Sequence, residues 1–576
     1  CAIVAIPGLR AIPWRTALAA MSTQFEHARG NWFRSALWIV VLGVSATSLV
    51  AGLAPPSDYD SLMYHLAIPK LDIEIGQIKM NWAHSGFGFF PQLMENLYRF
   101  GLTTGGEPVV QLMHGLFGLA AGGGAAALAR RFGFGTIAAL LAAIMFLVIR
   151  SVVWEMATSA VDIAISAFVV LAALVYTVWR RRSDNGLLVL FGVMIGGAIS
   201  TKYHGFPIVV GFIPVLLYDL ALRRATFAGG LIATGTSLLI ILPILIHNFI
   251  LAGNPIFPLF NSVFNPGERE LLDGIAASYG TGRGILNLLR APWDIFIFPS
   301  YYFDGFYYGS PYLLAFLPFA IFGWRRLKPA APAAVVAIIY FCEWFWLLSQ
   351  QTRFLLPIMP IVAAFAAVGA AVLWEAVSET RILRFALICS IIVLAINQSM
   401  FIGIYSVIRL PAALGLMAPT SYLSNTPGLD GVFYQTCAFI SRNLRVGERY
   451  LSYLSPHSYY CPQNSAIRIV FDDEKKYLLH SSEYPIMSLE ELIYRLRASN
   501  LRYIVVRTSH ESRRNITARA AITSTDFRKI RFGEFVGPAI AKLKPLNHDR
   551  FSEVYDGPAV IAELEKQHSA LSRMGQ

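Results

Sequence analysis

The chain has 576 residues, of which 56% are apolar and only 14% are charged. Soluble globular proteins carry roughly 25% charged residues, and a mean hydropathy of +0.54 indicates more apolar surface than water can cover. The composition excludes an ordinary soluble enzyme. The net charge is +12, yet no Lys/Arg-rich block stands in a soluble module. We therefore expect membrane lipids as partners and no nucleic acid.

The composition changes near residue 406. The first 405 residues contain 44 charged side chains, whereas the last 171 contain 38, so the charged fraction doubles from 11% to 22%. This difference predicts a membrane domain over 35–405 followed by a water-soluble domain over 406–576. Residues 1–34 contain no apolar stretch with a cleavage site, and we expect them to form a cytoplasmic N-terminal extension.

Eleven apolar runs are long enough, or nearly so, to cross the hydrocarbon core, which takes about 20 helical residues. They predict a polytopic α-helical membrane protein of about eleven spans. The predicted spans are 35–54, 108–129, 135–153, 160–179, 186–201, 205–221, 228–250, 310–324, 330–349, 354–374 and 385–405.

Basic residues cluster at alternate connections between these spans. By the positive-inside rule these connections face the cytoplasm, and the odd span count then places 406–576 outside. The clusters are Arg29 with Arg34, Arg130 with Arg131, Arg180–Arg182, Arg223 with Arg224, Arg325–Lys328, and Arg381 with Arg384.

Two long connections on the outer side carry more than linker sequence. Segment 55–107 alternates apolar and polar residues in a way typical of interfacial amphipathic helices. Segment 251–309 contains an aromatic run that begins at Tyr301 and Tyr302. Such aromatic residues are typical of a membrane-interface belt, and the alternative is a stacking surface for a sugar or an acceptor.

The tail alternates helix-like and strand-like stretches, which predicts a small α/β domain with a partly parallel sheet. It contains Cys437 and Cys461, 24 residues apart. In an oxidising compartment this pair is a candidate disulfide, and no cysteine spacing resembles a zinc site.

Ionisable and amide side chains in or beside spans are costly, so they are candidates for function. Those of this chain gather on the predicted outer face. Carboxylates together with Lys and Arg at one interface could deprotonate a nucleophile and hold a phosphate. The candidates are Asp58, Asp60, His65, Glu155, Asp162, Lys202, His204, Gln350 and Arg353.

Each candidate also has a structural interpretation. Asp58 could be a turn residue after two prolines, Asp162 could cap a helix N-terminus, and Lys202 could extend its side chain to the interface. Arg353 could be an anchor paired with a carboxylate, and His65 could be a surface histidine of a loop. No single residue decides between the interpretations.

Five segments in the expected order nevertheless resemble the GT-C class of integral-membrane glycosyltransferases. The likeness is to the bacterial branch similar to protein O-mannosyltransferases and the aminoarabinose transferase of lipid A, over roughly residues 35–410. One departure is Ser61, where many members carry Glu. The segments are Asp60–Leu66, Ala160–Asp162, Gly197–Tyr203, His247–Pro258 and Gln351–Pro357.

The resemblance implies transfer of a sugar, with inversion, from a polyprenyl-phosphate donor to a glycan, lipid or protein acceptor. Asp60 would be the general base, Lys202 and Arg353 would stabilise the leaving phosphate, and Asp162 would orient its neighbours. The implied location is the bacterial inner membrane, with the 406–576 domain periplasmic. The sequence establishes no cofactor, and a divalent metal beside Asp60 stays an open alternative.

Two other functions stay open from the sequence. A polytopic transporter would also carry intramembrane polar residues, although transporters place them near the bilayer midplane in repeated halves, and no internal repeat is evident here. An inactive GT-C-like subunit of a membrane complex is the second alternative, because Ser61 replaces the more usual Glu.

Overall fold

The computed structural model describes residues 32–78, 87–266, 279–302, 310–425, 434–452, 459–462, 466–467, 488–507, 532–549 and 552–574. Most of the predicted N-terminal extension lies outside the described residues. The same is true of the aromatic run after Tyr302.

Every regular element among the described residues up to Ala413 is a helix, which confirms the predicted fold class. Seven helices among the described residues are long and apolar enough to cross a membrane, and three apolar helices are shorter. The count of eleven spans stays a prediction. The main helices are α3 (Trp32–Ala51), α5 (Leu93–Arg131), α6 (Thr136–Leu147), α8 (Asp162–Arg182), α9 (Asn185–Thr201), α10 (Gly205–Ala221), α11 (Phe227–Ala252), α17 (Ala331–Trp346), α18 (Met359–Val377) and α19 (Arg381–Ala413).

Short helical segments connect the long ones. The predicted span 310–324 consists of α15 and η5 and belongs to a longer candidate span, Pro311–Trp346, and Pro318 lies where the α-helix changes to a 3-10 helix. The short segments are η1 (Ser61–His65), α4 (Ala67–Ile75), η3 (Phe87–Phe89), α7 (Arg150–Glu155), α12 (Asn261–Phe264), α14 (Ile285–Ile297), η4 (Pro299–Tyr302), α15 (Pro311–Phe316), η5 (Leu317–Gly323), α16 (Trp324–Leu327), η6 (Lys328–Ala330) and η7 (Thr352–Ile358).

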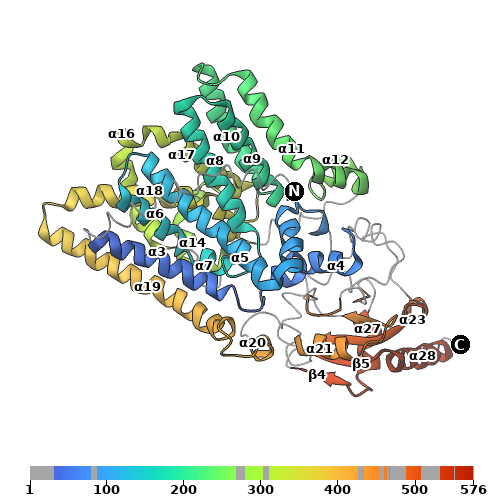
Figure 1. Cartoon of the computed structure of the whole chain (residues 1–576). Coiled ribbons are helices and arrows are strands. Elements are labelled where there is room, and N and C mark those ends of the chain that lie inside the picture. The colour runs from blue at the N-terminus through green and yellow to red at the C-terminus, as the bar shows by residue number, and fades with distance from the viewer. Residues whose placement is uncertain are drawn as a thin grey trace.

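Helix α8 is at the centre of the bundle. Its apolar stretch is 78% buried, against 6% for α19, and it packs on α5, α9 and η7. Small residues allow this close approach: a Cβ added at Gly124 of α5 would lie 2.6 Å from Cγ1 of Val170 on α8. Helix α19 instead lies at the edge of the bundle beside α3 (Figure 1) and exposes its apolar side chains.

Helix α5 begins well before the predicted span that starts at residue 108. Its N-terminal part is separated from the rest by Gly106, whose φ of 74° is left-handed, and by Pro108. Both residues interrupt the helical spacing of apolar residues in α5, so the apolar run that predicts a span begins only at this point of the sequence. The extra turns carry Glu95, a buried carboxylate that becomes important at the site.

The bundle has two chemically different ends. Helix α8 runs from Asp162 to Arg182, about 30 Å at 1.5 Å per residue. At its first residue it meets the end of α9 and the start of η7, which together form the carboxylate end. At the other, basic end lie Arg180 and Arg224, which contact Asp219 of α10.

The tail contains a five-stranded mixed sheet with the order β2-β1-β3-β5-β4. Strand β1 pairs in parallel with β2 and β3, and β5 pairs antiparallel with β3 and β4. The elements are α20 (Pro419–Asn425), α21 (Tyr434–Asn443), β1 (Arg449–Ser452), β2 (Ala466–Ile467), α23 (Leu489–Ala498), β3 (Leu501–Arg507), α27 (Phe532–Ile540), β4 (Asn547–His548), β5 (Ser552–Asp556) and α28 (Gly557–Met574).

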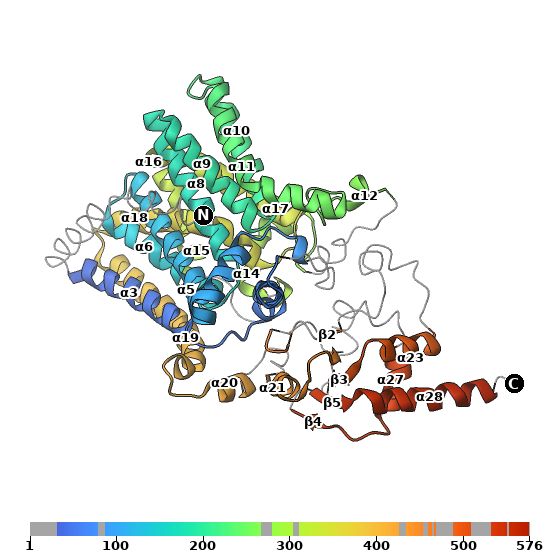
Figure 2. The same cartoon turned by 45° about the vertical axis from the view of Figure 1, so that its right-hand side comes forward.

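This C-terminal domain lies next to the carboxylate end. Figures 1 and 2 both place it, in orange and red, beside α4 and away from the free end of α10. Tyr460 Oη donates to the carbonyl oxygen of Pro56 at 2.7 Å, and Lys70 Nζ donates to the carbonyl oxygen of Tyr459 at 2.6 Å. The domain therefore contacts the first long loop directly.

Candidate active site

A single π-helical turn positions the first group of candidate residues. Asp60 caps η1, and the amide of Leu66 donates to the carbonyl oxygen of Ser61 at 2.9 Å, five residues back. Turns of this kind occur frequently at functional sites. Because residues five apart lie one turn apart in such a helix, Asp60 and His65 share a face of η1.

Asp60 is ion-paired with Arg353, which is 293 residues away in the sequence and belongs to η7. Burial alone would raise the pKa of Asp60, but the positive charges around it, that of Arg353 foremost, outweigh burial and hold that pKa below its ordinary value. The Asp60 side chain keeps 14% of its surface exposed and that of Arg353 keeps 21%. Both remain accessible to a ligand.

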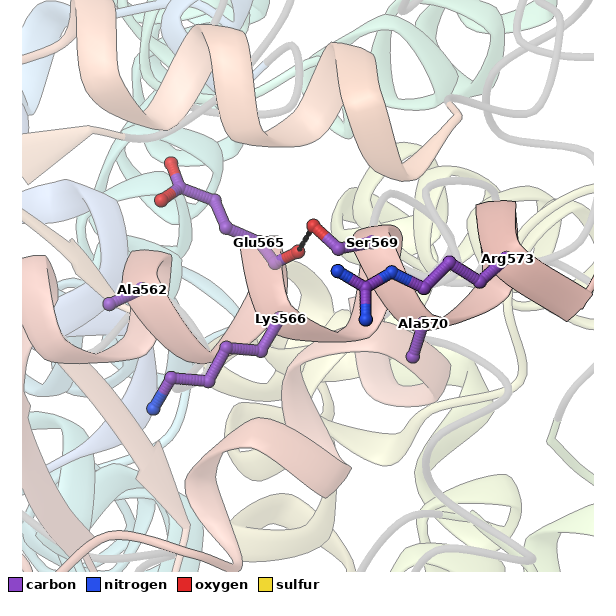
Figure 3. Close-up of a pocket in the computed structure, with 6 residues that line it drawn as sticks. All are labelled: Ala562, Glu565, Lys566, Ser569, Ala570 and Arg573. Carbon is purple, nitrogen blue, oxygen red and sulfur yellow. Dashed lines mark hydrogen bonds between the residues drawn. The ribbon is translucent and has the colours of Figure 1, made fainter.

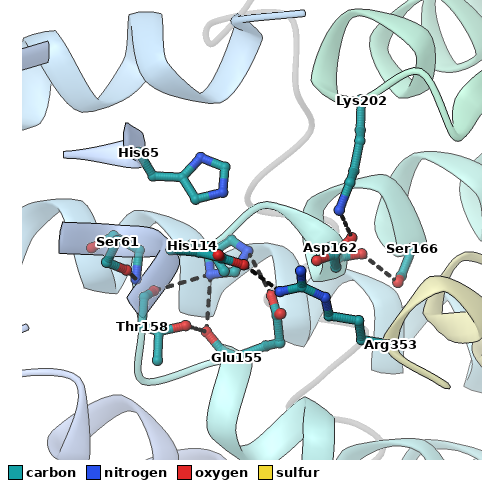
Figure 4. Close-up of polar contacts among 12 residues, drawn as sticks. Ser61, His65, His114, Glu155, Thr158, Asp162, Ser166, Lys202 and Arg353 are labelled. Carbon is teal, nitrogen blue, oxygen red and sulfur yellow. Dashed lines mark hydrogen bonds and ion pairs between the residues drawn. The ribbon is translucent and has the colours of Figure 1, made fainter. Parts of the chain in front are cut away.

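A second ion pair lies beside the first. Lys202 Nζ is 2.6 Å from Asp162 Oδ1, and these residues end α9 and begin α8. Figure 4 shows Lys202 and Arg353 pointing from different elements toward the space around Asp162. The turn to α10 requires glycine at 205, because an added Cβ would lie 2.5 Å from the backbone nitrogen of Ile199.

An aromatic ring supports both cations. Lys202 Nζ lies 4.5 Å and Arg353 Cζ 5.2 Å from the ring centre of Phe354. The ring of His204 packs on the same phenyl group, with 4.3 Å between ring centres. Phe354 was not among the sequence candidates, although it directly follows Arg353. Its contacts fix the two positive charges close together.

Glu155 lies behind these pairs and is fully buried. Burial, and next the negative charge of Asp162, raise its pKa well above the ordinary value. Its Oε2 is 3.6 Å from Nε2 of His114 on α5. Neither carboxyl oxygen makes a hydrogen bond within the described part of the chain. Burial thus favours the neutral form of the Glu155 carboxyl group.

Asp58 is placed as a turn residue. Its Oδ1 accepts a hydrogen bond from the amide of Ser61 at 3.0 Å, and its side chain is fully buried. Burial raises its pKa despite this hydrogen bond and the nearby charge of Arg409. Ser61 Oγ in turn accepts from the amide of Ser159 at 3.1 Å. Both residues therefore hold the loops in place around Asp60.

The site includes one carboxylate that the sequence analysis missed. Nδ1 of His65 is 2.6 Å from Oε1 of Glu95 on α5, and both side chains are about 95% buried. The signal for Glu95 was weak, because it precedes the apolar window of its helix. Its neighbour Pro91 and the break at Gly106 make the segment resemble a loop in the sequence.

The remaining candidates lie outside the ion-paired cluster. Gln350 is buried and donates to the carbonyl oxygen of Phe345 at 3.0 Å. Tyr302 is also buried and stacks on Trp344, whereas Tyr301 is 57% exposed. The carbonyl oxygen of Tyr302 accepts a hydrogen bond from Thr352 Oγ1 of η7 at 3.4 Å, and none of the three side chains makes a contact with Asp60 among the described residues.

A hollow of about 330 Å³ lies between α4, α5 and α11, and its lining includes Ser200, two residues before Lys202. The lining combines apolar side chains with polar and charged ones, among them the ion-paired Asp72 and Arg99. Its lining is Ile68, Leu71, Asp72, Ile78, Gly88, Gln92, Leu93, Asn96, Arg99, Ser200, Ile240, Pro243, Ile244 and His247.

A second hollow, of about 480 Å³ (Figure 3), is formed by the single helix α28, where Ser569 Oγ donates to the carbonyl oxygen of Glu565 in the same helix. In the second hollow Glu565 pairs with Arg497 of α23, and Lys566 pairs with Glu563, which is also on α28.

Cys437 of α21 and Cys461 form a disulfide. Cys461 directly follows Tyr460, which contacts the first loop. Ser57 Oγ also lies 3.1 Å from Tyr422 Oη of α20. The disulfide therefore ties the contacting tyrosine segment to the C-terminal domain.

Comparison with known proteins supports the fold. The profile of the PMT family, described as dolichyl-phosphate-mannose-protein mannosyltransferase, matches residues 106–253. The structure is similar to ArnT from Cupriavidus metallidurans bound to undecaprenyl phosphate, with a TM-score of 0.57 and 16% identity over 91% of this chain and 97% of that chain. No curated protein matches by sequence.

A second similar structure is the archaeal oligosaccharyltransferase AglB from Archaeoglobus fulgidus, solved with an inhibitory peptide and a dolichol-phosphate. Its TM-score is 0.52, with 12% identity over 88% of this chain and 72% of that chain. ArnT and AglB are GT-C glycosyltransferases. The predicted resemblance to this class is thus confirmed for the fold, which this chain shares at low sequence identity.

Proposed function

We propose that the protein is a membrane glycosyltransferase that moves a sugar from a polyprenyl-phosphate donor to an acceptor hydroxyl. The observation that carries the proposal is that two ion pairs, Asp60–Arg353 and Asp162–Lys202, lie together at one end of a GT-C-like bundle. The ring of Phe354 contacts the cation of each pair. The lipid phosphates bound by ArnT and AglB support the donor class. Such a donor suits a site with two cations beside a carboxylate.

In this reaction Asp60 accepts the proton of the acceptor hydroxyl, whose oxygen attacks the anomeric carbon of the sugar. The bond from that carbon to the phosphate oxygen breaks, and its electron pair stays on the phosphate. Attack from the face opposite the leaving group inverts the anomeric configuration. The leaving phosphate needs no proton, because a phosphate is already a good leaving group.

Lys202 and Arg353 stabilise the charge that develops on the leaving phosphate. Their effect is larger in the transition state than in the ground state, because the phosphate gains a negative charge as the bond breaks. Asp162 holds Lys202 in place. Among the described residues no three His, Cys, Asp or Glu side chains come together as metal ligands. The steps proposed here use side chains of the protein alone.

The hollow between α4, α5 and α11 is the candidate site for the lipid part of the donor. The apolar part of its lining is formed by isoleucine, leucine and proline side chains, and Ser200 in its lining is two residues from Lys202. An apolar chain in this hollow would leave its phosphate close to the cluster. The scarcity of charge in this part of the chain fits a substrate that is itself a lipid.

The proposed orientation follows from the basic clusters. Arg130, Arg131 and Arg180–Arg182 end their helices at the basic end of the bundle, which we assign to the cytoplasm. The carboxylate end and the C-terminal domain then face the outer side of a bacterial inner membrane, where acceptor glycans, lipids or proteins are available.

The test is the release of polyprenyl phosphate by purified protein from a panel of polyprenyl-phosphate sugars. We expect release from at least one donor, dependent on added acceptor, and an inverted anomeric configuration in the product. Folded protein that releases lipid phosphate from no donor would refute the proposal and favour an inactive subunit. Movement of an intact solute across proteoliposomes would favour a transporter.

A further inference from the structure

The pairing of His65 with Glu95 defines the chemical state of the imidazole. The Glu95 carboxylate accepts the hydrogen of Nδ1 at 2.6 Å, which leaves Nε2 with a lone pair and fixes one tautomer. Nε2 makes no hydrogen bond to any described residue. A buried imidazole that is oriented by a carboxylate and has an uncommitted nitrogen is arranged to accept a proton.

His65 follows Asp60 by one turn of η1, so the two side chains project from the same face of this short segment. Figure 4 shows the imidazole beside the cluster formed by His114, Glu155 and Asp162. The titratable groups around it are Tyr64 on η1, Glu95 and His114 on α5, and Asp60 with its partner Arg353.

Asp60 by itself is a poor final holder for a proton. Its ion pair with Arg353 keeps its pKa low. The carboxylate is therefore ionised, but it is a weak base and loses an accepted proton readily. Efficient general bases have pKa values near the working pH. Transfer of the proton to a second group would remove this disadvantage and restore the Asp60–Arg353 pair.

We propose, on the basis of the proposed function, that His65 held by Glu95 takes the acceptor's proton from Asp60 and is the final proton acceptor of the reaction. The acceptor O–H bond breaks as its oxygen bonds to the anomeric carbon, and the proton moves from the Asp60 oxygen to Nε2. The departing lipid phosphate gains one negative charge, and the imidazolium carries the matching positive charge. The proton then leaves to water, which restores neutral His65.

His114 shows why the assignment is specific to His65. It also faces a carboxyl group, that of Glu155, but its Nδ1 is directed at the carbonyl oxygens of Glu155 and Thr158 at 2.9 and 3.0 Å. Its side chain is completely buried, and its Nε2 is directed at the Glu155 carboxyl group. Its Nε2 makes no hydrogen bond among the described residues, and the ionisable group 3.6 Å from it is the buried Glu155 carboxyl group rather than Asp60.

The test compares the pH dependence of the transfer rate in wild type, His65→Gln and Glu95→Gln. We expect the wild-type rate to rise with pH over the range in which a histidine loses its proton. His65→Gln should lower the rate about 100-fold and abolish this rise. Glu95→Gln should lower it less and move the rise to lower pH, because the imidazolium loses its carboxylate partner.

The controls separate a proton relay from a structural role. His548→Gln, in exposed strand β4 of the C-terminal domain, should keep the wild-type rate and profile. A variant whose only defect is a distorted fold would lose activity equally at every pH. If the transfer rate of His65→Gln still rises with pH as in the wild type, His65 is not the proton acceptor. A wild-type protein with no transfer activity would instead refute the proposed function.

Discussion

The two ends of the bundle each contain a buried carboxylate paired with arginine or lysine, but the pairs differ in how completely they are satisfied. At the basic end, Asp219 is fully buried and accepts from Tyr176 Oη at 2.7 Å and from Arg180 at 2.9 Å, with Arg224 3.5 Å away. Three neighbours thus surround one carboxylate. This arrangement holds α8 and α10 together.

At the carboxylate end, Asp60 pairs with Arg353 and Asp162 pairs with Lys202, and the Asp60 side chain keeps 14% of its surface exposed, whereas that of Asp219 is fully buried. A fully buried carboxylate with three donors around it holds structure, whereas a partly exposed carboxylate can exchange a protein partner for a ligand. The comparison indicates that a reactive site differs from a structural ion pair in whether its carboxylate can still bind a ligand, and not in its charge alone.

The largest expected effect on transfer is at Asp60. Asp60→Asn removes the base and should lower the transfer rate by about 10²- to 10⁴-fold, while donor binding and thermal stability change little. The measurement is polyprenyl phosphate release at saturating donor. Asp184→Asn is the matched control, because Asp184 caps α9 from an exposed position and Asn caps equally well. Full activity of Asp60→Asn would direct attention to Asp58 as the base.

The next effect concerns the cations. Arg353→Ala and Lys202→Ala should each lower the transfer rate by about 10- to 1,000-fold, because each removes a charge that stabilises the leaving phosphate. We expect the apparent affinity for donor to fall more than that for acceptor. Separate titrations of the two substrates measure this difference. Wild-type donor affinity and rate in both variants would contradict the phosphate role.

A smaller effect is expected from the disulfide. Cys437→Ser releases Cys461 and loosens the tyrosine segment that contacts the first loop, so transfer should fall only a few-fold. The C-terminal domain should lose about 2–4 kcal/mol of stability. Thermal unfolding with and without reductant measures this loss, and Cys389→Ser, a free cysteine of α19, is the control. An unchanged unfolding profile would contradict the role assigned to the disulfide.

No effect on the transfer rate per folded molecule is expected at the basic end. Asp219→Asn leaves Arg180 and Arg224 without their counter-charge and should cost about 3 kcal/mol of stability, measured as a lower yield and a lower unfolding temperature in detergent. A strong loss of transfer in fully folded Asp219→Asn protein would remove the distinction between the two ends.

The fold class and the face that carries the candidate residues could be predicted from the sequence, because both follow from local patterns. Apolar runs fix the helices, and the basic clusters fix which connections lie together. The pairing within the site could not be predicted. Whether Asp60 pairs with Arg353 or Lys202 depends on the lateral order of α8, α9 and η7, which no local pattern encodes.

Glu95 shows a second limit. A carboxylate ahead of a helix break resembles a loop residue, and its partner His65 lies in a π-helical turn that has no sequence signature. Asp58 shows the opposite case, because its position after Pro55 and Pro56 already indicated a turn, and the structure places it as one. Local geometry is therefore easier to predict than contacts between distant segments.

The most direct test of the central claim is a structure of the protein with bound polyprenyl phosphate. We predict elongated lipid density in the hollow between α4, α5 and α11, ending in a phosphate within hydrogen-bond distance of Lys202 and Arg353 and near Asp60. Density that ends at the basic end, or at the bilayer midplane, would contradict the assignment of the carboxylate end as the site of sugar transfer.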